Sequence, residues 1–209
     1  MRALRPADRV LLLMAALVAA WQIVVGLEGK GTLAMVSYTI AFGILLVADL
    51  LLIILGFQAL DSPVVVILST AIPLGLAVGL TAEHVPARAD LVAVLASVAL
   101  VAVTIPRLAR WRRAGLATLI PVHGLAGLWI VGLPVVMVVL GRQPVPFLLV
   151  AIGGGLIGLG GMLLAFLKSG RPILSQPVIL SLFPSLLLAT TVALVSGFAL
   201  GQPILSIGG

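Results

Sequence analysis

Long uninterrupted apolar runs alternate with short polar breaks along the whole chain. Each run is close to the roughly 20 residues that an α-helix, at about 1.5 Å per residue, needs to cross about 30 Å of hydrocarbon. Strands of a membrane barrel would instead alternate apolar and polar residues over about ten positions. The pattern predicts an all-α, polytopic transmembrane helical bundle in one integral membrane domain. We expect about seven spans, over residues 10–27, 33–60, 63–80, 89–105, 116–140, 145–167 and 177–200.

The third of these spans is the one that could change the count. It is short, and it contains Pro73, which removes a backbone donor. A re-entrant segment here would leave six spans instead of seven.

Composition supports a membrane location. The chain is 62% hydrophobic and only 9% charged, whereas a soluble domain is about half apolar and a quarter charged. A soluble protein with so few charges would have too little polar surface to face water. There is no cysteine among the 209 residues, which excludes disulfides, thiol catalysis and Cys-ligated metals.

The basic residues predict the orientation. With seven spans, only Lys30, Arg88 and Arg142 fall on one side of the membrane. The positive-inside rule then places the N-terminus in the cytoplasm and the C-terminus outside, most simply in a prokaryotic plasma membrane. We therefore interpret the net charge of +6 as a topology and lipid signal, with no nucleic acid as partner. The opposite, cytoplasmic group is Arg2, Arg5, Arg9, Arg107, Arg110, Arg112, Arg113, Lys168 and Arg171.

The N-terminal basic residues and the first apolar run also match the start of a secretory signal, with Val18-Ala19-Ala20 as a small-residue cleavage site. The run is longer than a typical signal core. We expect it to be a retained helix.

The order of spans allows an internal repeat of three, one and three. Repeats of this kind are frequent in membrane transporters. Four spans separate the matched features, so the repeats would run parallel. The matched features are Trp21 and Trp129, Leu55-Gly56-Phe57 and Leu164-Ala165-Phe166, Ser62-Pro63-Val64 and Gln176-Pro177-Val178, and Pro73 and Pro184.

Asp49 is the most informative single residue, because it lies within the apolar second span. A carboxylate at the bilayer centre costs on the order of 2.5–3.5 kcal/mol on the translocon scale, so it should face the bundle interior and is a functional-site candidate. The alternative is a protonated Asp49 that donates a hydrogen bond across a helix interface.

His123 follows Pro121 in the fifth span. At about 1.5 Å per residue, His123 lies roughly 15 Å inside Arg113, and Asp49 lies roughly 18 Å inside Asp61, which are comparable depths. An Asp–His pair at one depth could relay protons or hold a ligand. The alternative is a histidine satisfied by a neighbouring helix.

Glycines crowd the sixth span. Gly154 and Gly158 form a GxxxG pattern, and Gly161 continues the same face one turn further. Small residues allow close helix approach, so we expect a tight helix crossing within the chain or in a homo-oligomer. The segment lies inside a span and lacks the preceding strand and the lysine of a phosphate-binding loop, which excludes that motif.

A basic segment, 106–113, separates the fourth and fifth spans. Arginine suits phosphate head groups and tryptophan suits the headgroup level, so we expect membrane lipids as partners here. The alternative is a topology signal without a specific ligand. The residues concerned are Arg107, Arg110, Trp111, Arg112 and Arg113.

Function is open between three classes. The first is a small secondary transporter or channel-like protein for an ion, proton or small solute, with Asp49 and His123 as the coupling candidates. The second is a non-catalytic subunit or assembly factor of a larger membrane complex. The third is a membrane-embedded lipid or quinone enzyme.

Enzyme function is not supported by any recognisable site. The sequence indicates no catalytic residue and no cofactor. Glu83 and His84 are expected in an exterior loop, where two ligands are too few for a metal site. A retinal pigment would need a lysine in the last span, 177–200, which has none.

Overall fold

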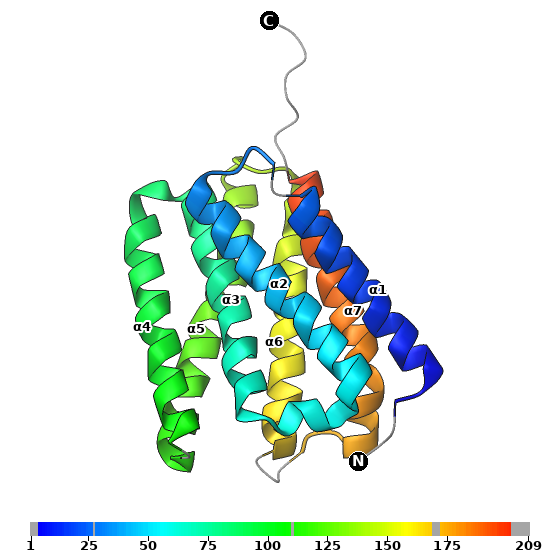
Figure 1. Ribbon diagram of the computed structural model, residues 1–209. Coiled ribbons are helices and arrows are strands. Elements are labelled where there is room, and N and C mark those ends of the chain that lie inside the picture. Colours follow the sequence, from blue (N-terminus) through cyan, green and yellow to red (C-terminus); the bar gives the residue numbers. More distant parts are fainter. Residues whose placement is uncertain (1–3, 27, 110, 169–171, 202–209) are drawn as a thin grey trace, which may run out of the picture.

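The computed structural model describes residues 4–26, 28–109, 111–168 and 172–201. Within these residues the secondary structure is helical, without strands, and seven helices are long and apolar enough to cross a membrane (Figure 1). The seven α-helices are α1 (Pro6–Val24), α2 (Thr32–Leu55), α3 (Pro63–His84), α4 (Ala89–Leu108), α5 (Arg112–Val139), α6 (Leu148–Lys168) and α7 (Gln176–Leu200). Three 3₁₀ helices join them: η1 (Gly56–Asp61), η2 (Pro86–Arg88) and η3 (Val145–Phe147).

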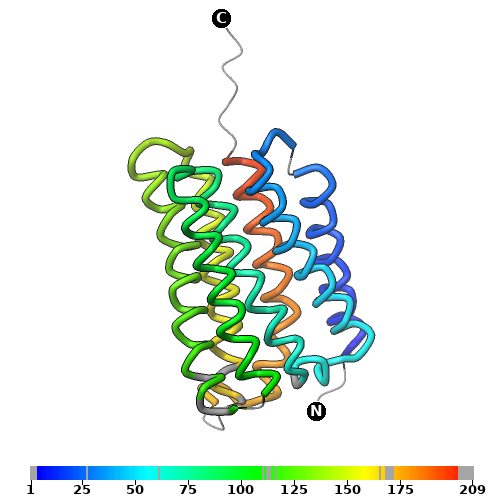
Figure 2. The backbone as a smooth tube through the Cα atoms, turned by 60° about the vertical axis from the view of Figure 1, so that its left-hand side comes forward, coloured from blue at the N-terminus to red at the C-terminus, as the bar shows by residue number. Residues whose placement is uncertain are grey.

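Successive helices run in opposite directions through one bundle (Figures 1 and 2). We call the two ends of the bundle the lower end, where α1 begins, and the upper end, where α1 finishes, as they are drawn in Figure 1. The α1–α2, α3–α4 and α5–α6 connections lie at the upper end, and η1 and the α4–α5 connection lie at the lower end. The protein is therefore a multi-pass helical integral membrane protein.

The third span is complete, so the six-span alternative is wrong. Helix α3 has 22 residues and continues through Pro73. It also extends to His84, which places Glu83 and His84 in the last turn of a helix and corrects their expected position in a loop. In a bundle, neighbouring helices and local adjustment satisfy the carbonyl that a proline leaves free.

Three other helix boundaries extend beyond the sequence prediction. Helix α1 begins at Pro6, because proline suits the first turn of a helix and the backbone N–H of Arg5 donates to Oδ2 of Asp8 at 2.9 Å. The expected basic loop 106–113 is mostly helical, since α4 continues to Leu108 and α5 starts at Arg112.

The second predicted span, 33–60, is not one continuous α-helix, because the helix ends at a glycine. Helix α2 ends at Gly56, whose φ is +69°, a left-handed conformation that costs other residues energy. The chain then continues as η1 to Asp61.

The neighbours of each helix follow a two-fold pattern. Helix α2 packs between α1 and α3, and α6 packs between α5 and α7. Helix α1 also packs against α7, as α5 does against α3. If α1, α2 and α3 are exchanged with α5, α6 and α7 in that order, the same set of packed pairs results. A parallel repeat requires this symmetry. The repeat itself stays a prediction. Helix α4 packs against α3 and α5 at the edge of the bundle.

Two hydrophobic clusters fill the bundle. The upper cluster includes Tyr38, Phe42 and Leu45 of α2 with Leu194 and Phe198 of α7. The lower cluster is Leu12, Leu52, Phe57, Ala59, Leu60, Leu180 and Phe183. Many large apolar side chains remain on the outside, such as Val94 at 60% and Leu128 at 72% exposure, as a bilayer allows.

Candidate functional sites

The Asp49 carboxyl group lies between the two clusters. Leu45, four residues before it, belongs to the upper cluster, and Leu52, three residues after it, belongs to the lower cluster. This spacing puts all three side chains on one face of α2. Asp49 is 0% exposed, as the sequence predicts for a carboxyl group within a span.

Neither Oδ1 nor Oδ2 of Asp49 has a hydrogen-bond partner among the described residues. The packing alternative requires such a partner on a neighbouring helix, and the described residues supply none. A buried polar group without a partner costs about 1–3 kcal/mol, and each such group in a native structure calls for an explanation. A bound proton or cation, which would neutralise and coordinate the oxygens, is the chemistry that this position can support.

The structure does not bring His123 to Asp49. Nδ1 of His123 lies 3.2 Å from the carbonyl oxygen of Leu119, one turn earlier in the same helix. Its helix, α5, packs against α3, α4 and α6, whereas α2 packs against α1 and α3. The pair expected from equal depth is therefore separated laterally, and His123 is satisfied within its own helix.

The glycines of α6 face in three directions. A Cβ atom on Gly154 would lie 2.5 Å from Cγ2 of Ile130 in α5, so this glycine does make a tight crossing. Gly158 and Gly161 are exposed, and a Cβ atom on either would meet nothing within 4 Å. Within the chain, the packing role falls instead to two other glycines, Gly153 against Leu194 and Gly160 against Leu186 of α7.

The basic segment at the lower end is only partly described. Nε of Arg107 is buried without a hydrogen-bond partner among the described residues, and this side chain lies beside Gly115. Trp111 is 59% exposed. Arg110 lies outside the described residues, as do the side chains of Arg112 and Arg113. Contact with lipid head groups stays a prediction.

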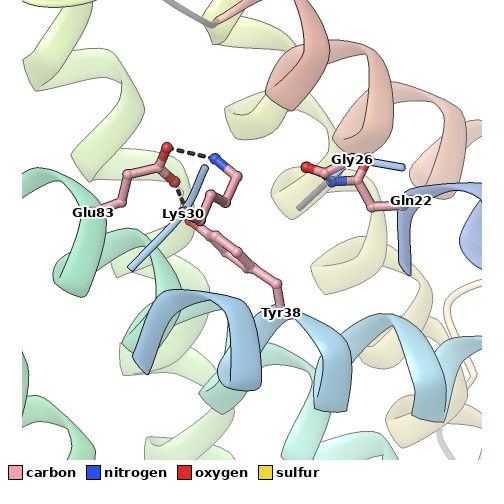
Figure 3. A network of polar contacts seen from close by, with 5 residues as sticks. All are labelled: Gln22, Gly26, Lys30, Tyr38 and Glu83. Carbon is pink, nitrogen blue, oxygen red and sulfur yellow. Dashed lines mark hydrogen bonds and ion pairs between the residues drawn. The ribbon is translucent and has the colours of Figure 1, made fainter. Parts of the chain in front are cut away.

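A third polar site, which sequence reasoning did not find, lies at the upper end. Nζ of Lys30 donates to Oε1 of Glu83 at 2.5 Å, and the hydroxyl of Tyr38 donates to Oε2 of the same carboxylate at 3.0 Å (Figure 3). The Lys30 side chain is 4% exposed and that of Glu83 is 26% exposed. We call Lys30, Tyr38 and Glu83 the upper polar site.

Two aromatic rings lie beneath the Lys30 ammonium group in this site. Nζ of Lys30 is 5.6 Å from the ring centroid of Tyr38 and 5.8 Å from that of Phe198. The two rings contact each other, with centroids 4.7 Å apart. Phe198 belongs to α7, so the site joins the α1–α2 connection to three helices.

His84, next to Glu83, makes no polar contact with Lys30 or Tyr38. Its ring packs edge-on against Phe147 of η3 with centroids 5.0 Å apart, and its Nε2 atom is buried without a hydrogen-bond partner among the described residues. The described residues contain no group of three or more side chains that could hold a metal ion.

Only weak sequence signals pointed to the upper polar site. Lys30 and Glu83 are 53 residues apart, and each stood in a segment expected to be a loop. The available signal was that both residues fall on the same predicted side of the membrane, next to adjacent spans.

No family model, curated protein or solved structure matches this chain. The fold defines its class, a seven-span helical membrane protein.

Proposed function

We propose that the protein is a small membrane transporter or channel-like protein that moves a proton or a small cation, and that Asp49 binds this ion. The observation that carries the proposal is the fully buried Asp49 carboxyl group, both of whose oxygens lack a hydrogen-bond partner among the described residues. Ionisable residues inside membrane spans are costly and mark ion and proton pathways.

The position of Asp49 supports occlusion from both sides. Above it, Tyr38, Phe42 and Leu45 of α2 are buried in the upper cluster, and below it Leu52 is buried in the lower cluster. An ion at Asp49 would be separated from both aqueous faces by packed apolar side chains. Transport would then require each cluster to open in turn.

The test is ion flux in proteoliposomes that contain the purified protein. For protons and sodium, a potassium diffusion potential drives the flux, and trapped pH-sensitive and sodium-sensitive dyes report it. For potassium, a concentration gradient without an added ionophore drives the flux, and a trapped potassium-sensitive dye reports it. We expect the Asp49→Asn protein to lose the flux, because an amide cannot bind and release a proton or neutralise a cation. Asp90→Asn is the matched control, since Asp90 is exposed in the first turn of α4.

Equal flux in the parent and Asp49→Asn proteins would remove Asp49 from the mechanism. Native mass spectrometry of the gently extracted protein tests the competing class, a non-catalytic subunit of a larger complex. A parent protein that conducts none of the three ions and arrives with partner chains would replace the transporter proposal with that one.

A further inference from the structure

We propose that Glu83, Tyr38 and Phe198 form a binding site for a monovalent ammonium-type cation, and that Lys30 occupies this site as a tethered occupant. These three residues belong to three different helices, α3, α2 and α7 respectively. We call Glu83, Tyr38 and Phe198 the cation cage.

The contacts of the Lys30 ammonium group define the chemistry of the cage. It has a carboxylate oxygen of Glu83 at 2.5 Å and two ring faces within 6 Å. A carboxylate combined with aromatic faces is the arrangement that recognises ammonium ligands. The ammonium group is also almost withdrawn from water, because the Lys30 side chain is 4% exposed, and cation–π attraction is stronger when the cation is desolvated.

The cage holds its shape through contacts that do not involve Lys30. Tyr38 donates to Glu83 and packs against Phe198. Gly79 of α3 leaves the space that the Tyr38 ring fills. Removal of Lys30 would therefore leave a formed site, in which the Glu83 carboxylate keeps its hydrogen bond from Tyr38 and loses its only ion-pair partner among the described residues.

Lys30 itself lies in the connection between α1 and α2, outside both helices. Glycines stand on both sides of it, at positions 29 and 31, and neither would have a neighbour within 4 Å of an added Cβ atom. Gly29 has a φ of +74°. The carboxylate is reachable at the upper end, since the Glu83 side chain is 26% exposed, so an incoming cation can exchange with Lys30.

The ligand class follows from what the cage lacks as well as from what it contains. A divalent metal needs several oxygen ligands, and the described residues offer one carboxylate here and no larger acidic group. An anion would be repelled by the negative charge of the Glu83 carboxylate. A compact alkylammonium ion matches the group that the cage already holds.

One residue of the cage, Tyr38, also lies on the same face of α2 as Asp49. Tyr38, Phe42, Leu45 and Asp49 follow one another on a single face of α2, at spacings of four, three and four residues. A role of the cage as the upper entrance for a transported cation rests on the proposed function, whereas binding of a cation does not. Binding of a cation to the cage can be measured without flux, so the two proposals can fail separately.

The first test uses Lys30→Ala with propylammonium, which replaces the atoms that the substitution removes. We expect the melting temperature of the purified Lys30→Ala protein to rise saturably with propylammonium and not with sodium at the same ionic strength. A tethered group competes at an effective concentration in the millimolar range, so the parent protein should need a higher propylammonium concentration than Lys30→Ala for the same rise. Arg88→Ala removes an exposed basic residue at the same end of the bundle, and it should behave as the parent does.

The Glu83→Gln substitution added to Lys30→Ala should abolish the response to propylammonium. An undiminished response in that double variant, or equal responses of Lys30→Ala to propylammonium and sodium, would overturn the proposal.

The second test needs no substitution, because the chain contains only two lysines, Lys30 and Lys168. An amine-reactive reagent is applied to the parent protein, and mass spectrometry measures the labelling rate at each lysine. Tetramethylammonium, which the reagent does not modify, should displace Lys30 and raise its labelling rate several-fold while Lys168 is unchanged. Labelling of Lys30 that tetramethylammonium does not alter beyond the effect of sodium would overturn the proposal.

Discussion

The ring of Tyr38 in α2 lies against Gly79 of α3, where an added Cβ atom would meet the ring carbons, Cζ among them at 2.8 Å. Tyr38 cannot easily turn away, because its hydroxyl donates to Glu83 and its ring packs on Phe198. One residue without a side chain thus allows an aromatic ring, an ion pair and three helices to meet at the upper end.

We predict that Gly79→Ala destabilises the protein by about 1–3 kcal/mol, the usual cost of overpacking a well-filled core. Reversible unfolding in mixed micelles measures the free energy. The control is Gly43→Ala in α2, where an added Cβ atom meets nothing within 4 Å. Equal stabilities of the Gly79→Ala and parent proteins would contradict the close contact.

The glycines of α6 should differ in their sensitivity to substitution. Gly154→Ala places a Cβ atom 2.5 Å from Ile130 of α5, and Gly158→Ala places one in open space. We expect the first to lower the free energy of unfolding by about 1–3 kcal/mol and the second to change it by less than about 0.5 kcal/mol. A loss of stability in Gly158→Ala that tracks a loss of homo-oligomer in native mass spectrometry would show that this glycine packs against a second copy.

The orientation can be tested directly, because the chain contains no cysteine. Single cysteines are introduced as Glu28→Cys at the upper end and Ser175→Cys at the lower end, both at exposed positions. The positive-inside rule predicts that a membrane-impermeant maleimide labels Glu28→Cys in intact cells and reaches Ser175→Cys only after lysis. The reverse pattern would invert the predicted orientation.

The upper polar site should limit access of water to the face of α2 that leads to Asp49. Leu45 is 2% exposed and lies between Tyr38 and Asp49 on that face. We predict that Leu45→Cys reacts slowly with a small water-soluble thiol reagent. Adding Glu83→Gln should raise the rate several-fold, because it weakens the charge-assisted bonds that join α2, α3 and the α1–α2 connection.

Adding Arg88→Ala to Leu45→Cys is the control for the loss of a charge at the upper end. An unchanged rate after Glu83→Gln would mean that the upper polar site does not restrict access to this face.

Much of the fold was predictable from the sequence for one physical reason. The bilayer sets both the length and the apolar character of a span, and it leaves backbone groups no partner other than those of the helix itself. The seven spans follow, as does the burial of Asp49, since a carboxyl group facing lipid would be too costly. The starts of α1 and α5 and the ends of α3 and α4 lie beyond the prediction, because these helices continue into the polar interface, where hydropathy no longer marks them.

The contacts between helices were decided by the tertiary structure alone. Hydropathy cannot tell which face of a span points inward, because lipid tails are as apolar as the side chains of the interior. Equal depth therefore suggested a pair of Asp49 and His123 that the order of helices separates, and a GxxxG pattern did not reveal that Gly154 packs inside the chain while Gly158 stays outside it. The bond between Lys30 and Glu83 depends on how α2 and α3 are rotated and on the path of the α1–α2 connection. Such arrangements are fixed by close packing and by hydrogen bonds between residues far apart in the chain, and neither leaves a periodic trace in the sequence.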